Sequence, residues 1–162
     1  MYITSGDMND SVALLVADSS RFFRRRFDAR ARRIGVSRAQ WQVLFALSRN
    51  EGINQAGLAE ALDVETITVG RMVDRLEEAG LVERRADPAD RRAWRLHLTD
   101  RAHPILDELR AVGDVVMKEA MAGIDDHEQA ALGALLTRLR ANLCGRGEPD
   151  AAPLPTKMAS NI

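Results

Sequence analysis

Residues 58–98 read LAEALDVETITVGRMVDRLEEAGLVERRADPADRRAWRLHL. In the first half of this stretch, the apolar positions keep helical spacing on both sides of residues 63–65, where the spacing breaks. We therefore expect two helices that meet at a tight turn, with Val64 buried in the corner between them. Gly80 can adopt a positive φ and is expected to end the second helix. The apolar positions are Leu58, Leu62, Val64, Val69, Met72 and Val73.

The second half of the stretch predicts a β-hairpin. Residues 81–85 and 94–98 have strand character, and in the second run apolar and polar residues alternate. Because arginines gather here, the tip of the hairpin is expected to be basic although the formal net charge of the chain is -1. Two helices followed by such a hairpin predict a winged helix-turn-helix in a mainly α chain. The arginines are Arg84, Arg85, Arg91, Arg92 and Arg95, and Asp87 and Asp90 lie among them.

The second helix carries a face that a protein core does not explain. With its apolar side inward, the residues left outside are Thr66, Ile67, Thr68, Gly70, Arg71 and Asp74. Hydroxyl groups can bond phosphates or base edges, an isoleucine can contact a thymine methyl, and an arginine can bind guanine O6 and N7. We interpret this face as one that enters the major groove of DNA, with a wing arginine in the adjacent minor groove. An ordinary solvated helix face is the alternative.

This stretch resembles the MarR family of transcriptional regulators, and within it the SlyA-like members, through LAEALDVETITVGRMVDRLEEAGLVER and DPADRRAWRLHLT. The resemblance extends more weakly over about residues 9–143. It implies a homodimer on a pseudo-palindromic double-stranded DNA operator, with Ile67, Thr68, Gly70 and Arg71 facing the major groove. It also implies that Arg91 or Arg92 reaches the minor groove, and that Asp90 braces the wing by pairing with an arginine.

Composition bounds the class of protein. The chain has 162 residues, enough for one domain, and is 46% hydrophobic and 29% charged. Neither an apolar run of membrane-spanning length nor a signal-type leader is evident, so we expect a cytoplasmic protein with no membrane partner. The single cysteine, Cys144, excludes an internal disulfide.

No catalytic or cofactor chemistry is expected. The sequence offers no nucleophile with a base and an acid, no glycine-rich phosphate loop and no paired catalytic carboxylates. The histidines His97, His103 and His127 lack metal-ligand spacing. The sequence therefore predicts neither an enzyme nor a metal or other cofactor.

A long first helix is expected to start after N-cap candidates at residues 9–11. It carries an apolar stripe into which Arg26 and Arg30 fall, and a buried guanidinium needs a partner. The simpler account is a salt bridge to an acid on another helix, or a side chain that extends to water. The other account is capture of the carboxylate or phosphate of a small ligand. The stripe comprises Val12, Leu15, Val16, Ser19, Phe22, Phe23 and Phe27.

The next helix begins with a capping box formed by Ser37 and Gln40. On this helix, Trp41 and Phe45 are core residues in the simpler interpretation. The family resemblance, however, implies a cleft beside this helix that holds phenolic or other aromatic anions, or in some members coenzyme A thioesters. The candidate ligand residues are therefore Phe23, Arg26, Arg30, Trp41 and Phe45.

Two further helices are expected between residues 100 and 143. Thr99 should cap the first, and a capping box of Asp125 and Glu128 should begin the second, which carries a leucine stripe. We interpret residues 9–36 and 100–143 as a helical dimerisation region and residues 37–99 as the winged helix-turn-helix. Residues 1–8 should form a flexible arm and residues 144–162 a disordered tail. The stripe comprises Leu132, Leu135, Leu136, Leu139 and Leu143.

Together with the resemblance, these features predict a sequence-specific dimeric regulator, a repressor released by a small aromatic anion or an aromatic acyl-CoA. One alternative is a winged helix used for protein contact, which Arg71 and the basic tip argue against. Another is an oxidant sensor. Regulators of that kind in the family carry a cysteine near the start of the first helix, whereas Cys144 lies at the end of the last one.

Overall fold

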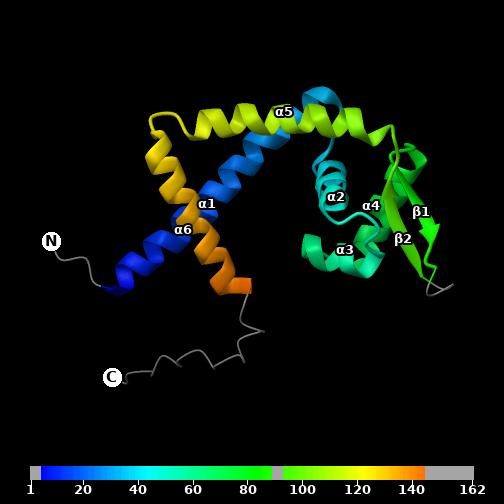
Figure 1. The fold of residues 1–162 in the computed structure, drawn as a ribbon, viewed down its shortest axis with the longest axis horizontal. Helices are drawn as coiled ribbons and strands as arrows, with labels where there is room; N and C mark the ends of the chain where they lie inside the picture. Colours follow the sequence, from blue (N-terminus) through cyan, green and yellow to red (C-terminus); the bar gives the residue numbers. More distant parts are fainter. Residues whose placement is uncertain (1–4, 89–92, 145–162) are drawn as a thin grey trace, which may run out of the picture. The chain divides into compact units, whose positions relative to one another are not determined.

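The computed structural model describes residues 5–88 and 93–144, and Figure 1 shows the order of their elements. These residues form helices and one two-stranded antiparallel sheet, which confirms the expected mainly α fold with a hairpin wing. The chain divides into two compact units at the boundary between Ala120 and Met121. None of the described helices is long and apolar enough to cross a membrane. The elements are α1 (Ser5–Ala31), η1 (Arg32–Ile34), α2 (Arg38–Arg49), α3 (Gln55–Leu62), α4 (Thr66–Glu78), β1 (Val82–Ala86), β2 (Trp94–Leu98), α5 (Ala102–Ala120) and α6 (Asp126–Cys144).

The core of the first unit lies where α2, α3, α4, α5 and the sheet pack together. Helix α4 shows how the sequence produces it, because Val69, Val73 and Leu76 recur at helical spacing and are completely buried. Burial of each such side chain contributes about 1.5–3 kcal/mol. Other fully buried members of this core are Val43, Leu44, Leu47, Leu58, Val82, Leu96, Leu106 and Leu109.

The expected tight turn joins α3 to α4. The side chain of Asn54 caps α3 by accepting from the Gly57 amide at 2.8 Å, and Asp63 ends it in the left-handed conformation at φ 53°. The prediction that Val64 is buried was wrong, since this side chain is 39% exposed. After the left-handed residue, the Val64 amide donates back to the Ala59 carbonyl at 3.1 Å, and its side chain lies at the surface.

The hairpin has the predicted antiparallel pairing, with Val82 opposite Leu98 and Ala86 opposite Trp94. Its first strand begins one residue later than expected. The connection between α2 and α3 joins it, because the Gly52 amide donates to the Leu96 carbonyl at 2.9 Å and the Leu96 amide to the Ile53 carbonyl at 3.0 Å. The wing is thus hydrogen-bonded to the helices that it follows.

The structure confirms two of the predicted helix starts and corrects two others. Both capping boxes are present, with the Ser37 amide 2.9 Å from Gln40 Oε1 and the Glu128 amide 2.8 Å from Asp125 Oδ1. Helix α1 already begins at Ser5, before the proposed caps at residues 9–11, so residues 5–8 are helical. The prediction that Thr99 caps α5 was wrong. Its hydroxyl donates to the Gly80 carbonyl at 2.7 Å, where Gly80 has the expected positive φ of 67°, and α5 begins three residues later.

A buried carboxylate ties α1 to α2. Asp28 accepts hydrogen bonds from Arg38 Nε at 2.7 Å and from the Trp41 indole nitrogen at 2.9 Å. Burial acts to raise the pKa of Asp28, but these two donors and the arginine charge outweigh it and hold the pKa below its ordinary value. The carboxylate is therefore ionised and bonded where the two helices meet.

Helix α6 lies in the second unit and presents an apolar face to solvent in the single chain. Its five stripe leucines, at positions 132, 135, 136, 139 and 143, are between 37% and 74% exposed. None of the residues of α6 is buried. An exposed apolar helix face of this kind is a surface that a partner can cover.

Candidate nucleic-acid interface

Helix α4 presents the polar face that its sequence predicts. Because Val69, Val73 and Leu76 point into the core, the opposite side is left to solvent. Ile67 is 68% exposed although its side chain is apolar, and the fold of the described residues gives no reason for this exposure. The exposed side chains of the predicted face are Thr66, Ile67, Thr68, Arg71 and Asp74. Five of the six residues predicted to face the major groove are therefore accessible to solvent on α4.

Gly70 has a role within the fold. It is partly buried, and a Cβ at this position would approach Nε2 of Gln55 to 3.1 Å. Gln55 lies over the first turn of α4 and donates from this nitrogen to the Thr66 carbonyl at 3.2 Å. The absence of a side chain at Gly70 thus lets α3 pack closely on α4. A close approach of the Gly70 backbone to DNA stays a prediction.

The wing is described only at its base, because Asp90, Arg91 and Arg92 lie outside the described residues. At the base, Arg95 pairs with the buried side chain of Asp87 at 2.8 Å and donates to the Gly52 carbonyl at 3.0 Å. The Asp87 amide also donates to the Ala93 carbonyl at 3.0 Å. Asp87 and Arg95 therefore fix the base of the wing against the turn that precedes α3.

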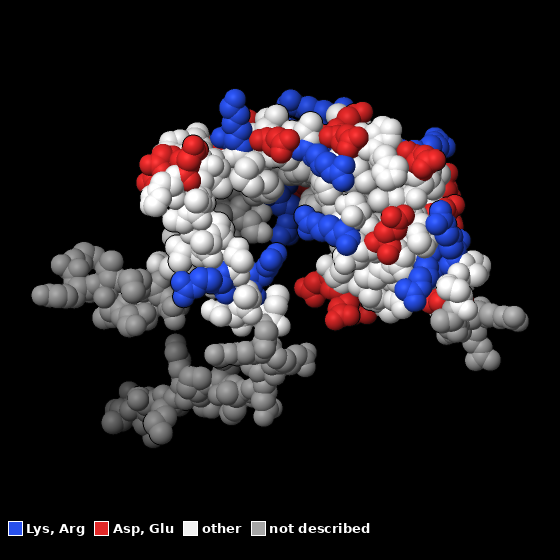
Figure 2. Space-filling model, viewed as in Figure 1, with Lys and Arg blue, Asp and Glu red and all other residues white. Residues whose placement is uncertain are grey.

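The expected excess of positive charge is not carried by the described strands of the hairpin. Arg84 is held by Asp74 at 2.6 Å and by Glu77, and Arg85 pairs with Glu83. Burial acts to lower the pKa of Arg84, but the two carboxylates outweigh it and raise the pKa above its ordinary value. Figure 2 likewise shows basic and acidic side chains interspersed on the face that it views.

Two cations of α4 differ from those of the hairpin. Arg71 and Arg75 are exposed and form no ion pair with any described residue. With Thr68, they line a shallow cleft between α4 and the start of α2, where Ser37 and Gln40 form the opposite wall. This cleft lies beside the exposed face of α4, so the unpaired charge of the helix lies next to the predicted base contacts.

Known proteins share the fold of this chain. The model of the MarR family matches residues 34–93, and the structure of the transcriptional regulator PA3341 is similar at 38% identity and a TM-score of 0.73. That similarity covers 83% of this chain and 99% of the other. The chain belongs to the MarR family. Wild-type MarR from E. coli, in its apo form, is similar at 25% identity and a TM-score of 0.71, over 86% of this chain and 98% of that one.

Membership of the MarR family makes this chain a transcriptional regulator with a winged-helix DNA-binding fold. The structure of the regulator SlyA has the same fold, at 22% identity and a TM-score of 0.71, with 83% of this chain and 94% of that chain covered. The fold predicted from residues 58–98 and the family predicted from their motifs are both confirmed.

The candidate ligand residues of this MarR-family chain lie on α1 and α2. Trp41 and Phe45 pack with Phe27, and the ring centroids of Phe27 and Trp41 are 4.9 Å apart. Phe23 is partly buried. Trp41 and Phe45 therefore pack against the core, as the simpler interpretation of these two residues expected.

The two arginines of α1 share one acid. Arg26 Nη1 lies 3.2 Å from Glu119 Oε2, and Arg30 pairs with the other oxygen of the same carboxylate. The predicted salt bridge to an acid on another helix is confirmed, because Glu119 belongs to α5. No group of three metal-ligating side chains occurs in the described part of the chain.

Several residues that hold the helices together were missed by sequence reasoning. Asp28, Gln55 and Glu119 each act on a partner at least ten residues away, and the sequence gives no signal of which partner each one meets. Asp87 was detectable in part, because it lies beside the predicted hairpin tip with arginines on both sides. Its pairing with Arg95 follows from the antiparallel register, which brings the two strand ends together.

Proposed function

We propose that this MarR-family regulator binds a specific double-stranded DNA operator as a homodimer, with α4 of each subunit in a major groove. The observation that carries the proposal is the exposed face of α4, on which Arg71 lacks an acidic partner among the described residues. An arginine in this position can form a bidentate bond with guanine O6 and N7. Arg71 is proposed to read a base, while Thr66 and Thr68 bond phosphates or base edges.

The remaining contacts come from the family resemblance and from side-chain chemistry. Ile67 is proposed to contact a thymine methyl group, and the Gly70 backbone to lie close to the DNA. Arg91 or Arg92 would enter the minor groove, with Asp90 holding an arginine of the wing in place. The fixed base of the wing at Asp87 and Arg95 supports this proposal, because it restrains the strands that carry the tip.

A homodimer is proposed because two helices leave apolar surface uncovered in the single chain. On α1, Val12, Leu15, Val16 and Phe22 are exposed, and on α6 the leucine stripe is exposed as well. Large exposed apolar patches mark interfaces. Residues 9–36 and 100–143 would form the dimerisation region, and two-fold symmetry would present the two copies of α4 to half-sites one helical turn apart.

The regulator is proposed to be a repressor that an aromatic anion or aromatic acyl-CoA releases from DNA. The proposed site comprises Phe23, Arg26, Arg30, Trp41 and Phe45. Glu119 bonds both guanidinium groups, and we propose that an anionic ligand displaces this carboxylate from them. Such an exchange would change the link between α1 and α5, with a coupling free energy on the order of 1–3 kcal/mol.

Two alternatives remain distinguishable. A winged helix that binds a protein would not need unpaired arginines beside an exposed helix face, and its binding would depend weakly on salt. An oxidant sensor would use Cys144, which is exposed at the end of α6. As a regulator of transcription, the chain is proposed to act in the cytoplasm, and its DNA binding should be insensitive to peroxide.

Replacing Arg71 tests the proposed major-groove contact. Arg71→Ala should cost about 1–3 kcal/mol in binding to duplex DNA from the region upstream of the gene, and should relax the preference at one base position. Gel-shift titration against single-base variants of that duplex measures both effects. Arg110→Ala is the control, because Arg110 is an exposed arginine of α5 paired with Asp107. Equal affinities for the wild type and Arg71→Ala would remove this side chain from the interface.

Replacing Arg26 tests the proposed effector site. With 4-hydroxybenzoate as the probe, Arg26→Ala should bind at least about tenfold more weakly, since a hydrogen bond to a charged group contributes about 1.5–3 kcal/mol. Calorimetric titration measures the affinity. Arg24→Ala is the matched control, since Arg24 is exposed on the same helix and bonds only to Ser20 among described residues. If the wild type binds the probe and Arg26→Ala binds it equally well, Arg26 is not part of the site.

Placing a charge on the leucine stripe tests the proposed dimer. Leu135 is 60% exposed in the single chain, and Leu135→Glu should shift the mass measured by light scattering from two chains toward one. Ala141→Glu adds the same charge on the opposite side of α6 and should leave the mass at two chains. A wild-type protein with the mass of one chain at working concentration would contradict the dimer.

A further inference from the structure

The start of α4 carries a carboxylate in an unusual place. Glu65 is the N-cap residue, and its side chain makes no capping hydrogen bond. An N-cap side chain normally accepts from an amide in the first turn, as Asn54 does at the start of α3. Glu65 is exposed and has no ion pair among the described residues. The contacts of the described residues therefore show no structural role for the charge of Glu65.

The backbone at this point favours an anion. The amides of Thr68 and Val69 donate to the Glu65 carbonyl at 2.9 and 3.1 Å, whereas no described group accepts from the amides of Thr66 and Ile67. Free amides and the helix dipole attract phosphate at a helix start. In a helix that enters DNA, this is where a backbone phosphate would gain most from binding. Glu65 places a negative charge at that point.

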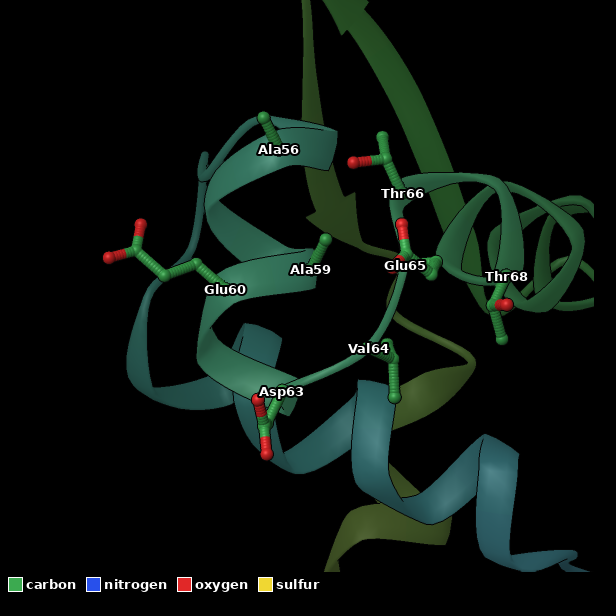
Figure 3. A pocket seen from close by; sticks show the side chains of 8 residues that line it. All are labelled: Ala56, Ala59, Glu60, Asp63, Val64, Glu65, Thr66 and Thr68. Atoms are coloured by element: carbon green, nitrogen blue, oxygen red, sulfur yellow. The ribbon is translucent and has the colours of Figure 1, made fainter. Parts of the chain in front are cut away.

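The surrounding sequence strengthens the negative potential. Residues 50–70 contain four acidic residues and no lysine or arginine. Figure 3 shows Glu65 beside Thr66 at the edge of the depression between α3 and α4, with Asp63 at the turn and the Glu60 side chain pointing away from the depression. The first cation of α4 is Arg71, more than one helical turn further on. Glu65 is thus the acidic residue at the helix start itself.

We propose that Glu65 is a specificity-determining residue that weakens the binding of phosphates at the start of α4. Its repulsion acts over the Debye length, about 8 Å at physiological salt, and so reaches the phosphates nearest to Thr66 and Thr68. Non-specific DNA binding depends almost entirely on phosphates, whereas operator binding also gains from base contacts. Glu65 therefore weakens non-specific binding more than operator binding. This inference rests on the proposed function, in which α4 meets DNA.

The test compares two charge-neutralising variants of the same helix. Glu65→Gln removes the charge at the start of α4, and Glu78→Gln removes an exposed charge at its last residue, about 20 Å away at 1.5 Å per residue. Each is titrated, over a series of salt concentrations, with duplex DNA from upstream of the gene and with a scrambled duplex of equal length. Thermal unfolding of each variant shows whether the fold is intact.

Glu65→Gln should bind the scrambled duplex about two- to fivefold more tightly, the size of effect that one exposed charge has at a helix end. Its salt dependence on that duplex should steepen by up to about 0.9, because one more phosphate is engaged. The gain on the upstream duplex should be smaller, so that the ratio of the two affinities falls. Glu78→Gln should match the wild type, and Glu65→Asp, which keeps the charge, should stay close to it.

Asp63→Asn provides a second variant if Glu65→Gln unfolds. Asparagine tolerates the left-handed conformation of this residue, and the same change in direction is expected with a smaller size. The inference fails if Glu65→Gln and Glu78→Gln bind the scrambled duplex alike. It also fails if Glu65→Gln loses affinity for the upstream duplex, because Glu65 would then accept from a base. A wild type that binds neither duplex would refute the proposed function itself, and this inference with it.

Discussion

The burial of one side of α4 is the constraint on which the rest of the structure depends. Val69, Val73 and Leu76 have no exposed surface, and rotation of the helix would bring them to water at a cost of about 1.5–3 kcal/mol for each side chain. The bond from Gln55 to the Thr66 carbonyl also holds the first turn. The outward direction of Arg71 and Ile67 is therefore set by core packing. The exposed face of α4 is therefore oriented by the core behind it.

The pairing of arginines, more than their number, decides where positive charge is available. Arg84 and Arg95 are held by acids, and Glu119 holds two arginines of α1. Arg71 and Arg75 of α4 lack such partners among the described residues. This division explains how a chain with a formal net charge of -1 can belong to a family of DNA-binding regulators. The pairs made by Glu119 join α1 to α5, whereas Arg71 and Arg75 are exposed.

Local chemistry made much of the fold predictable from the sequence. Helical spacing located the buried side of α4, the Ser37 and Asp125 capping boxes marked helix starts, and Gly80 marked a positive φ. The two errors have different causes, one a contact between distant segments and the other a local backbone conformation. Thr99 bonds to Gly80 instead of capping its own helix, and Val64 is turned outward by the left-handed Asp63. In the candidate site, the exposed face of α4 could be predicted from helical spacing. The contact between Gly70 and Gln55 could not, because it depends on how α3 packs against α4.

We propose that two copies of the exposed face of α4 meet successive major grooves on one side of the DNA. Hydroxyl-radical footprinting of the wild-type protein on its upstream DNA measures whether they do. We expect two protected half-sites whose centres are about 10–10.5 base pairs apart, or a multiple of that distance, and related by two-fold symmetry. A single protected segment, or protection without helical periodicity, would contradict it.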